Sequence, residues 1–126
     1  MQVKIDTREK FHAITILEPV LAANMTEELG NCLLPLLKQP VKNVVLILKD
    51  IPELEEAAAE CLVNIQQTFY EGGASFVICE LSPGVEQFLE DSGLLEMMNV
   101  TPTESEAWDI VQLEEVEREL LDDSEG

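Results

Sequence analysis

The chain is organised around residues 48–62, LKDIPELEEAAAECL. The residues just before this stretch, 41–48, are mostly aliphatic and β-branched, which is typical of a strand covered on both faces. Apolar side chains then recur at helical spacing, at Leu54, Ala58, Cys61, Leu62, Ile65 and Phe69. A buried strand therefore leads into a helix with an acidic start, and we expect the functional surface of the protein at this junction.

Further strands are predicted on both sides of the junction. Residues 74–79, ASFVIC, have the pattern of a second fully buried strand. Residues 2–6 alternate polar and apolar side chains, and a polar turn separates them from a second strand at 11–17, which predicts an antiparallel hairpin. Residues 97–100 fit a short edge strand.

The expected helices are marked by their start and stop signals. Asn24 is the predicted N-cap of a first helix, and Pro35 in the interior of that helix predicts a kink or restart. The Gly-Gly pair at 72–73 should end the second helix. A Ser-Pro pair at 82–83 opens a third helix, and a capping box at 103–106 opens the last.

This alternation of strands and helices predicts an α/β fold. We expect a small mixed sheet, mostly parallel with an antiparallel edge hairpin, and helices mainly on one face. With 126 residues the chain is long enough for one hydrophobic core.

The charge of the chain limits the kinds of molecule that it can bind. The net charge is −19, and between Lys49 and Arg118 there are seventeen Asp and Glu residues but no Lys or Arg. Binding to nucleic acid or to an anionic membrane surface depends on basic side chains, so both are excluded. We expect a protein partner with a basic face.

Neither a leader nor a membrane segment is expected. The first residues, MQVKIDTREK, have no apolar core of a signal peptide, and no run approaches the about 18 apolar residues of a membrane span. The cysteines, Cys32, Cys61 and Cys79, are scattered among apolar neighbours, as in reduced core thiols. We therefore predict a cytoplasmic protein.

No catalytic or metal-binding constellation stands out. The carboxylates of Glu53, Glu55, Glu56 and Glu60 look solvent-facing, whereas acid–base pairs need burial and a hard-cation site needs a shaped loop. His12 lies within a strand without a nucleophile nearby, so we interpret it as structural. The prediction is a protein that is not an enzyme and needs no metal or cofactor.

Residues 72–108, GGASFVICELSPGVEQFLEDSGLLEMMNVTPTESEAW, resemble the STAS domain, named for sulfate transporters and anti-sigma-factor antagonists. The similarity rests on the order of five short motifs: Gly72-Gly73, Ser82-Pro83, Phe88-Leu89, Ser92-Gly93-Leu94 and Glu106-Ala107. It covers roughly residues 3–111 and is greatest to the single-domain bacterial antagonists. It divides the chain into a STAS-like domain at 1–112 and an acidic C-terminal helix extension and tail at 113–126.

The resemblance implies a mechanism. In this family the dephosphorylated antagonist binds an anti-sigma kinase and frees the sigma factor, and the kinase phosphorylates a Ser or Thr where the second helix begins. Counting back from the Gly-Gly pair places that acceptor at Glu56, and counting forward from Asp50 places it at Ala57. No hydroxyl side chain lies between Lys49 and Gln67, so the phosphoacceptor is absent in either register. Glu55 and Glu56 either imitate the charge of a phosphate or only stabilise the helix start.

The resulting hypothesis is a non-catalytic regulatory module that binds an anti-sigma factor or a kinase-like ATPase. The expected contact residues, called the acidic surface below, are Asp50, Glu53, Glu55, Glu56, Glu60 and Asn64. The alternative hypothesis is an accessory or scaffold subunit of a larger assembly such as a transport complex. A homodimer is compatible with both.

The last helix carries an apolar stripe past the end of the resemblance, at Ile110, Leu113, Val116, Leu120 and Leu121. The simpler interpretation is a helix packed along its own domain. The alternative is a contact with a partner's groove or with a second copy. Trp108 is expected to anchor this helix to the sheet.

Overall fold

The computed structural model describes residues 1–125, and for residues 122–125 the backbone alone. Within this range the strands form a five-stranded sheet in the order β1-β2-β4-β6-β7 and a two-stranded sheet of β3 and β5. The strands are β1 (Val3–Thr7), β2 (Phe11–Ile16), β3 (Val20–Leu21), β4 (Asn43–Ile47), β5 (Glu53–Leu54), β6 (Phe76–Cys79) and β7 (Val100–Thr101). The pair β1–β2 is antiparallel and every other pair is parallel, which confirms the predicted mixed sheet with an edge hairpin.

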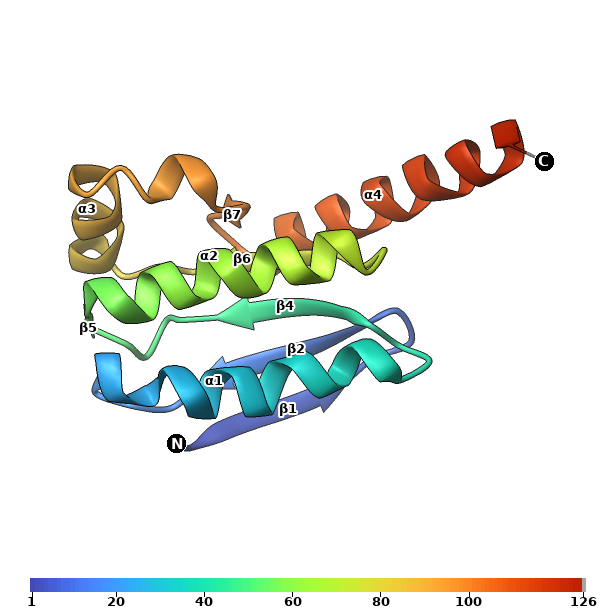
Figure 1. Ribbon diagram of the computed structural model, residues 1–126. Coiled ribbons are helices and arrows are strands. Elements are labelled where there is room, and N and C mark those ends of the chain that lie inside the picture. Colours follow the sequence, from blue (N-terminus) through green and yellow to red (C-terminus); the bar gives the residue numbers. More distant parts are fainter. Residues whose placement is uncertain (126) are drawn as a thin grey trace.

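The helices cover the sheet unequally (Figure 1). Helices α1 (Thr26–Leu33), α2 (Glu56–Glu71) and α3 (Pro83–Asp91) pack on one face over the larger apolar core. Helix α4 (Glu104–Glu125) crosses the other face, and its last turns project past the edge of the sheet. Helices mainly on one face are thus confirmed.

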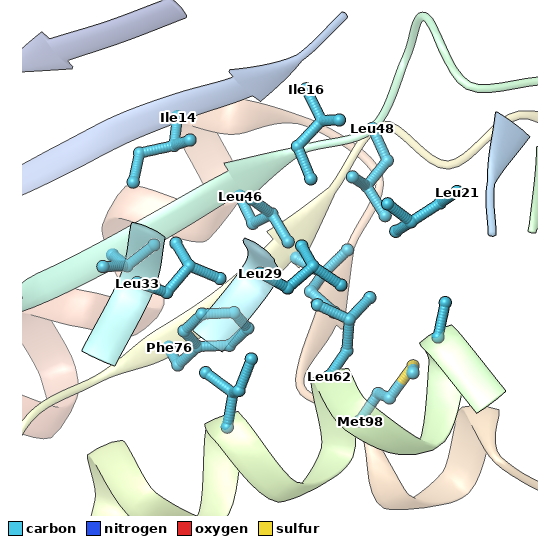
Figure 2. Close-up of a cluster of buried hydrophobic side chains, with 14 of the residues drawn as sticks. Ile14, Ile16, Leu21, Leu29, Leu33, Leu46, Leu48, Leu62, Phe76 and Met98 are labelled. Carbon is cyan, nitrogen blue, oxygen red and sulfur yellow. The ribbon is translucent and has the colours of Figure 1, made fainter. Parts of the chain in front are cut away.

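The core explains the aliphatic run of β4, because this strand is buried on both faces. Val44 and Leu46 point into the larger core, while Val45 and Ile47 point into the smaller core under α4. Figure 2 shows Leu46 in this core together with Leu29 of α1 and Leu62 of α2. A strand in the middle of a covered sheet has no solvent face, so its sequence shows no alternation.

Helix α1 begins differently from the prediction. A short 3₁₀ helix, η1 (Ala23–Met25), precedes it, and the N-cap of α1 is Met25, without a side-chain hydrogen bond. The prediction of Asn24 as N-cap is therefore wrong, since that residue lies inside η1. The break at Pro35 is confirmed: α1 ends at Leu33 and continues as a 3₁₀ helix, η2 (Leu34–Lys38), which tolerates Pro near its start.

Two further boundaries differ from the prediction. Leu54, expected in the second helix, lies in β5, which pairs with β3. A two-residue strand is too short to show a period of two, and its partner is distant in sequence. At the β7 edge of the five-stranded sheet, a 3₁₀ helix, η3 (Leu95–Met97), occupies the start of the strand expected at 97–100. Of that segment only Val100 belongs to β7.

Helix α4 is anchored at both ends of the sheet face. Its start is the predicted capping box, in which the Glu106 amide donates to Thr103 Oγ1 at 3.1 Å. The Trp108 ring stacks on Phe11 with centroids 4.9 Å apart, which confirms its anchoring role. Near the beginnings of β4 and β6, Glu115 Oε1 accepts from Asn43 Nδ2 at 2.7 Å.

Beyond this anchor the prediction for the last helix fails. Ile110 is partly buried against the smaller core, but Leu113, Val116, Leu120 and Leu121 are exposed. The interpretation of a helix packed along its own domain is therefore wrong for Leu113, Val116 and Leu120, whereas Leu121 borders a depression that residues 40–43 also line. The last five residues of the predicted extension and tail, 122–126, lie outside the residues whose side chains are described, and the division at residue 112 stays a prediction.

Candidate protein-binding surface

The junction between β4 and α2 is held by hydrogen bonds to α3 and to β3 and by a turn of its own. Ile51 is fully buried, and its carbonyl accepts a hydrogen bond from Ser82 Oγ, the N-cap residue of α3, at 3.0 Å. The amide of Ile51 donates back to Leu48 O at 3.1 Å, which closes a turn. The amide of Glu55 donates to Leu21 O at 2.9 Å, extending the pairing of β5 with β3. The backbone of residues 48–55 is thereby fixed to its neighbours.

Glu55 has an unexpected role in this junction. It is the N-cap residue of α2, but its side chain makes no capping hydrogen bond to that helix. Instead Glu55 Oε1 accepts from the Ala23 amide at 2.7 Å, at the first residue of η1. The carboxylate therefore ties two segments together, 32 residues apart in sequence. Sequence reasoning missed this contact because only the tertiary structure brings Ala23 near the junction.

All six residues of the acidic surface are exposed. On α2, Glu56, Glu60 and Asn64 are spaced four apart and form one row along the solvent face of the helix. The opposite side of the same helix buries Leu62 and Ile65 in the core. The arrangement leaves the row accessible to a partner, and its use as a contact surface stays a prediction.

The two positions predicted to correspond to the family's phosphoacceptor lie in the first turn of α2. Glu56 and Ala57 are both exposed there, whereas Ala58 and Ala59 are fully buried. A hydroxyl group at position 56 or 57 would thus be open to solvent, and one at 58 or 59 would not. Both registers of the family motif remain compatible with this geometry.

A shallow open depression adjoins the junction. It has a volume of about 390 Å³ and is bounded by residues 52–56 on one side and by α3 on the other, through Gly84, Val85 and Phe88. These α3 residues were not among the predicted contact residues. The topology offers a signal for them, because β4 and β6 are adjacent parallel strands and the segments after them begin at the same edge of the sheet.

His12 is buried, and its ring nitrogens contact Thr7 Oγ1 at 2.9 Å and Val41 O at 2.8 Å. Within residues 1–121, three or more His, Cys, Asp or Glu side chains nowhere gather as metal ligands would. No helix of the described chain is long and apolar enough to cross a membrane.

The three cysteines are free thiols. Burial raises the pKa of Cys79 to about 12, with nearby Glu80 adding to the effect. Burial also raises the pKa of Cys32 and of Cys61. A raised pKa keeps each thiol protonated and unreactive at neutral pH, as expected of core residues.

Comparisons with solved structures identify the fold. The Thermotoga maritima protein TM1081, proposed as an anti-sigma-factor antagonist, is 17% identical, with a TM-score of 0.73, over 87% of this chain and 94% of that one. A Ser-to-Glu variant of RsbS from Moorella thermoacetica is 19% identical, with a TM-score of 0.72, over 89% and 96%. The murine Solute Carrier 26 family member A9 anion transporter is 14% identical, with a TM-score of 0.65, over 82% of this chain but 18% of the transporter.

Of the sequence comparisons, the one with family models agrees with the structural result. No curated protein matches the chain's sequence significantly. The family model of the STAS domain, however, matches residues 2–107, a range that includes the whole sheet and the start of α4. On this match, and with the fold just described, the chain belongs to the STAS domain family.

Proposed function

We propose that this protein is a non-catalytic regulatory module that binds a protein partner through the acidic surface. The observation that carries the proposal is the exposed row of Glu56, Glu60 and Asn64 beside a fixed junction. Anti-sigma-factor antagonists are prominent among the structural neighbours, which supports a cytoplasmic regulator of this type. The proposed partner is an anti-sigma factor or a kinase-like ATPase that presents a basic face to this surface.

The regulator is not switched by phosphorylation at α2. One structural neighbour, SpoIIAA, is known in an unphosphorylated and a phosphorylated form. This chain has Glu and Ala where α2 begins, so it offers no acceptor there. Glu55 and Glu56 both place a negative charge at the exposed helix start, and the Glu55 carboxylate also accepts from the Ala23 amide.

Charge reversal on α2 tests the contact surface. The double variant Glu56→Lys/Glu60→Lys should bind the partner about tenfold or more weakly, because it replaces attraction with repulsion at a basic face. Titration calorimetry with the anti-sigma factor or ATPase encoded beside the gene measures the effect. The matched control is Glu86→Lys/Glu90→Lys on α3, which has the same spacing, exposure and charge change. Equal loss in both variants would mean that net charge alone drives binding.

Reintroducing a hydroxyl group tests the lost switch. A cognate kinase with ATP should leave α2 of the natural chain unlabelled and should label Ala57→Ser or Glu56→Ser, whichever is in register. Phosphopeptide mass spectrometry locates the label. Glu60→Ser, one turn further along the same face, should remain unlabelled. Label on Ser82 or Ser92 of the natural chain would show that the site lies elsewhere.

A second candidate is an accessory subunit of a transport complex. The similarity to a segment that makes up 18% of an anion transporter favours this candidate, because a STAS fold can serve as part of a transport protein. Gene neighbours separate the candidates: an adjacent anti-sigma kinase supports the regulator, and adjacent permease genes support the subunit. Recovery of a membrane transport complex in pull-down experiments would likewise favour the second candidate.

A further inference from the structure

Helix α4 has apolar side chains on two opposite sides. Ala107 and Val111 are fully buried against the sheet. Leu113, Val116 and Leu120 are 56%, 51% and 63% exposed, and at 3.6 residues per turn they lie on the far side of the helix from the buried pair. We call these three residues the outer stripe. A surface helix of a globular domain needs one apolar side, so the outer stripe is not required for packing on this domain.

The domain itself cannot cover the outer stripe by rotating the helix. Glu115 Oε1 accepts from Asn43 Nδ2 at 2.7 Å, and Arg118 Nη1 donates to Ser75 Oγ at 3.2 Å. Asn43 and Ser75 are buried residues, and the Asn43 side chain also accepts the Ser75 amide at 2.8 Å. Turning the outer stripe inward would withdraw these partners from buried polar groups, which is costly. The stripe therefore faces away from the sheet, in a part of α4 beyond the family match at 2–107.

The charges around the stripe select its partner. Glu117 and Glu119 are exposed on either side of Val116, and the whole chain carries −19. A second copy docked through the same stripe would bring like charges together. Three side chains also cover far less than the about 800 Å² per partner of a standard interface, so two such helices laid side by side would make a weak dimer. A concave apolar surface with basic rims satisfies both the stripe and its flanking carboxylates.

We propose that residues 113–121 of α4 are a second docking element, whose outer stripe inserts into an apolar groove rimmed by Lys and Arg on another protein. This element lies by the beginnings of β4 and β6, while the acidic surface lies at their ends, so the two surfaces occupy opposite ends of the domain (Figure 1). Each can be occupied without blocking the other. The proposal does not depend on the identity of the partner bound at α2.

A designed probe tests this inference directly. The probe is a synthetic two-helix peptide with a Leu-lined groove and Lys on both rims, titrated calorimetrically into the full chain. The natural chain should bind it, and Leu113→Ser/Leu120→Ser should bind about tenfold or more weakly. The matched control is Ile5→Ser/Leu17→Ser, which removes side chains that are 48% and 40% exposed elsewhere. This control should bind the probe with the same affinity as the natural chain. Added salt should weaken the binding of the probe to both proteins.

Three results would overturn the proposal. The first is that the Leu113→Ser/Leu120→Ser variant binds the probe as tightly as the natural chain does. Val116→Asp, a different substitution in the same stripe, should give the same answer as the double variant. The second is equal affinity for a peptide of the same design with Glu rims. The third is a dimer in sedimentation equilibrium that the double variant dissociates, which would assign the stripe to a second copy. Unchanged urea midpoints of the variants show that the fold is intact.

Discussion

Replacing Phe69 with Ala is expected to lower the free energy of unfolding by about 3–5 kcal/mol. The ring is fully buried on the inner side of α2 and packs on Phe76, with centroids 5.2 Å apart. Truncation removes these contacts and leaves a cavity that the surrounding strands cannot fill. Since small domains have a total stability of about 5–15 kcal/mol, the loss is a large fraction of the whole.

The neighbouring residue supplies the control for this prediction. Tyr70 is also aromatic and lies on the same turn of α2, but it is 72% exposed. Tyr70→Ala should therefore change stability by no more than about 0.5 kcal/mol. Urea unfolding followed by circular dichroism measures both variants. Similar losses for the two would contradict the placement of α2 on the sheet.

The second large effect is expected from Val111→Asp, which should lower the free energy of unfolding by about 3–5 kcal/mol. The substitution puts an uncompensated carboxylate into an apolar contact. Val111 is fully buried between α4 and the sheet, in the smaller core with Val45 and Val77. Release of α4 would separate Trp108 from Phe11 and expose the indole to water. Trp108 fluorescence should then shift to longer wavelength at neutral pH.

The destabilisation caused by Val111→Asp should decrease as the pH falls, because a protonated carboxyl group is less costly to bury than an ionised one. Gln112→Asp, one residue further on an exposed side of α4, adds the same charge and should leave the fluorescence unchanged. Hydrogen exchange should locate the opening in α4, while α1 and α2 stay protected. Uniform loss of protection along the chain would instead mean that α4 and the sheet unfold as one unit.

Much of the fold was predictable because its signals are local. The aliphatic run at 41–48 predicted a doubly covered strand, and β4 is buried on both faces. Pro35 predicted the end of α1, and the Gly-Gly pair at 72–73 predicted the end of α2, where Gly73 has a φ of 75°. In each case the side chain or its absence restricts the backbone directly.

The failures share another cause, which is that the deciding partner is distant in sequence. Leu54 has helical spacing with Ala58, yet it lies in β5, which pairs with β3 in a two-stranded sheet. The outer stripe is as apolar as the side of α4 that carries Val111, and contacts with residues distant in sequence, made by Trp108, Glu115 and Arg118, decide which side faces the sheet. Such choices depend on contacts that no local pattern encodes.

The candidate site was predictable to a similar degree. Helical spacing places Glu56, Glu60 and Asn64 on the solvent side, and the structure has them exposed. The capture of the Ala23 amide by Glu55 was not predictable, since it depends on how η1 approaches the junction. The α3 residues that bound the depression were missed for the same reason.

The fixing of residues 48–55 has a consequence for the kinetics of association. Their backbone is tied by Ile51 to α3, by Glu55 to η1 and by β5 to β3, so its conformational entropy is already lost when the domain folds. A partner that docks at this junction orders side chains alone. We therefore expect the free and bound backbones to superpose closely and association to proceed in one step, without a slow rearrangement after encounter.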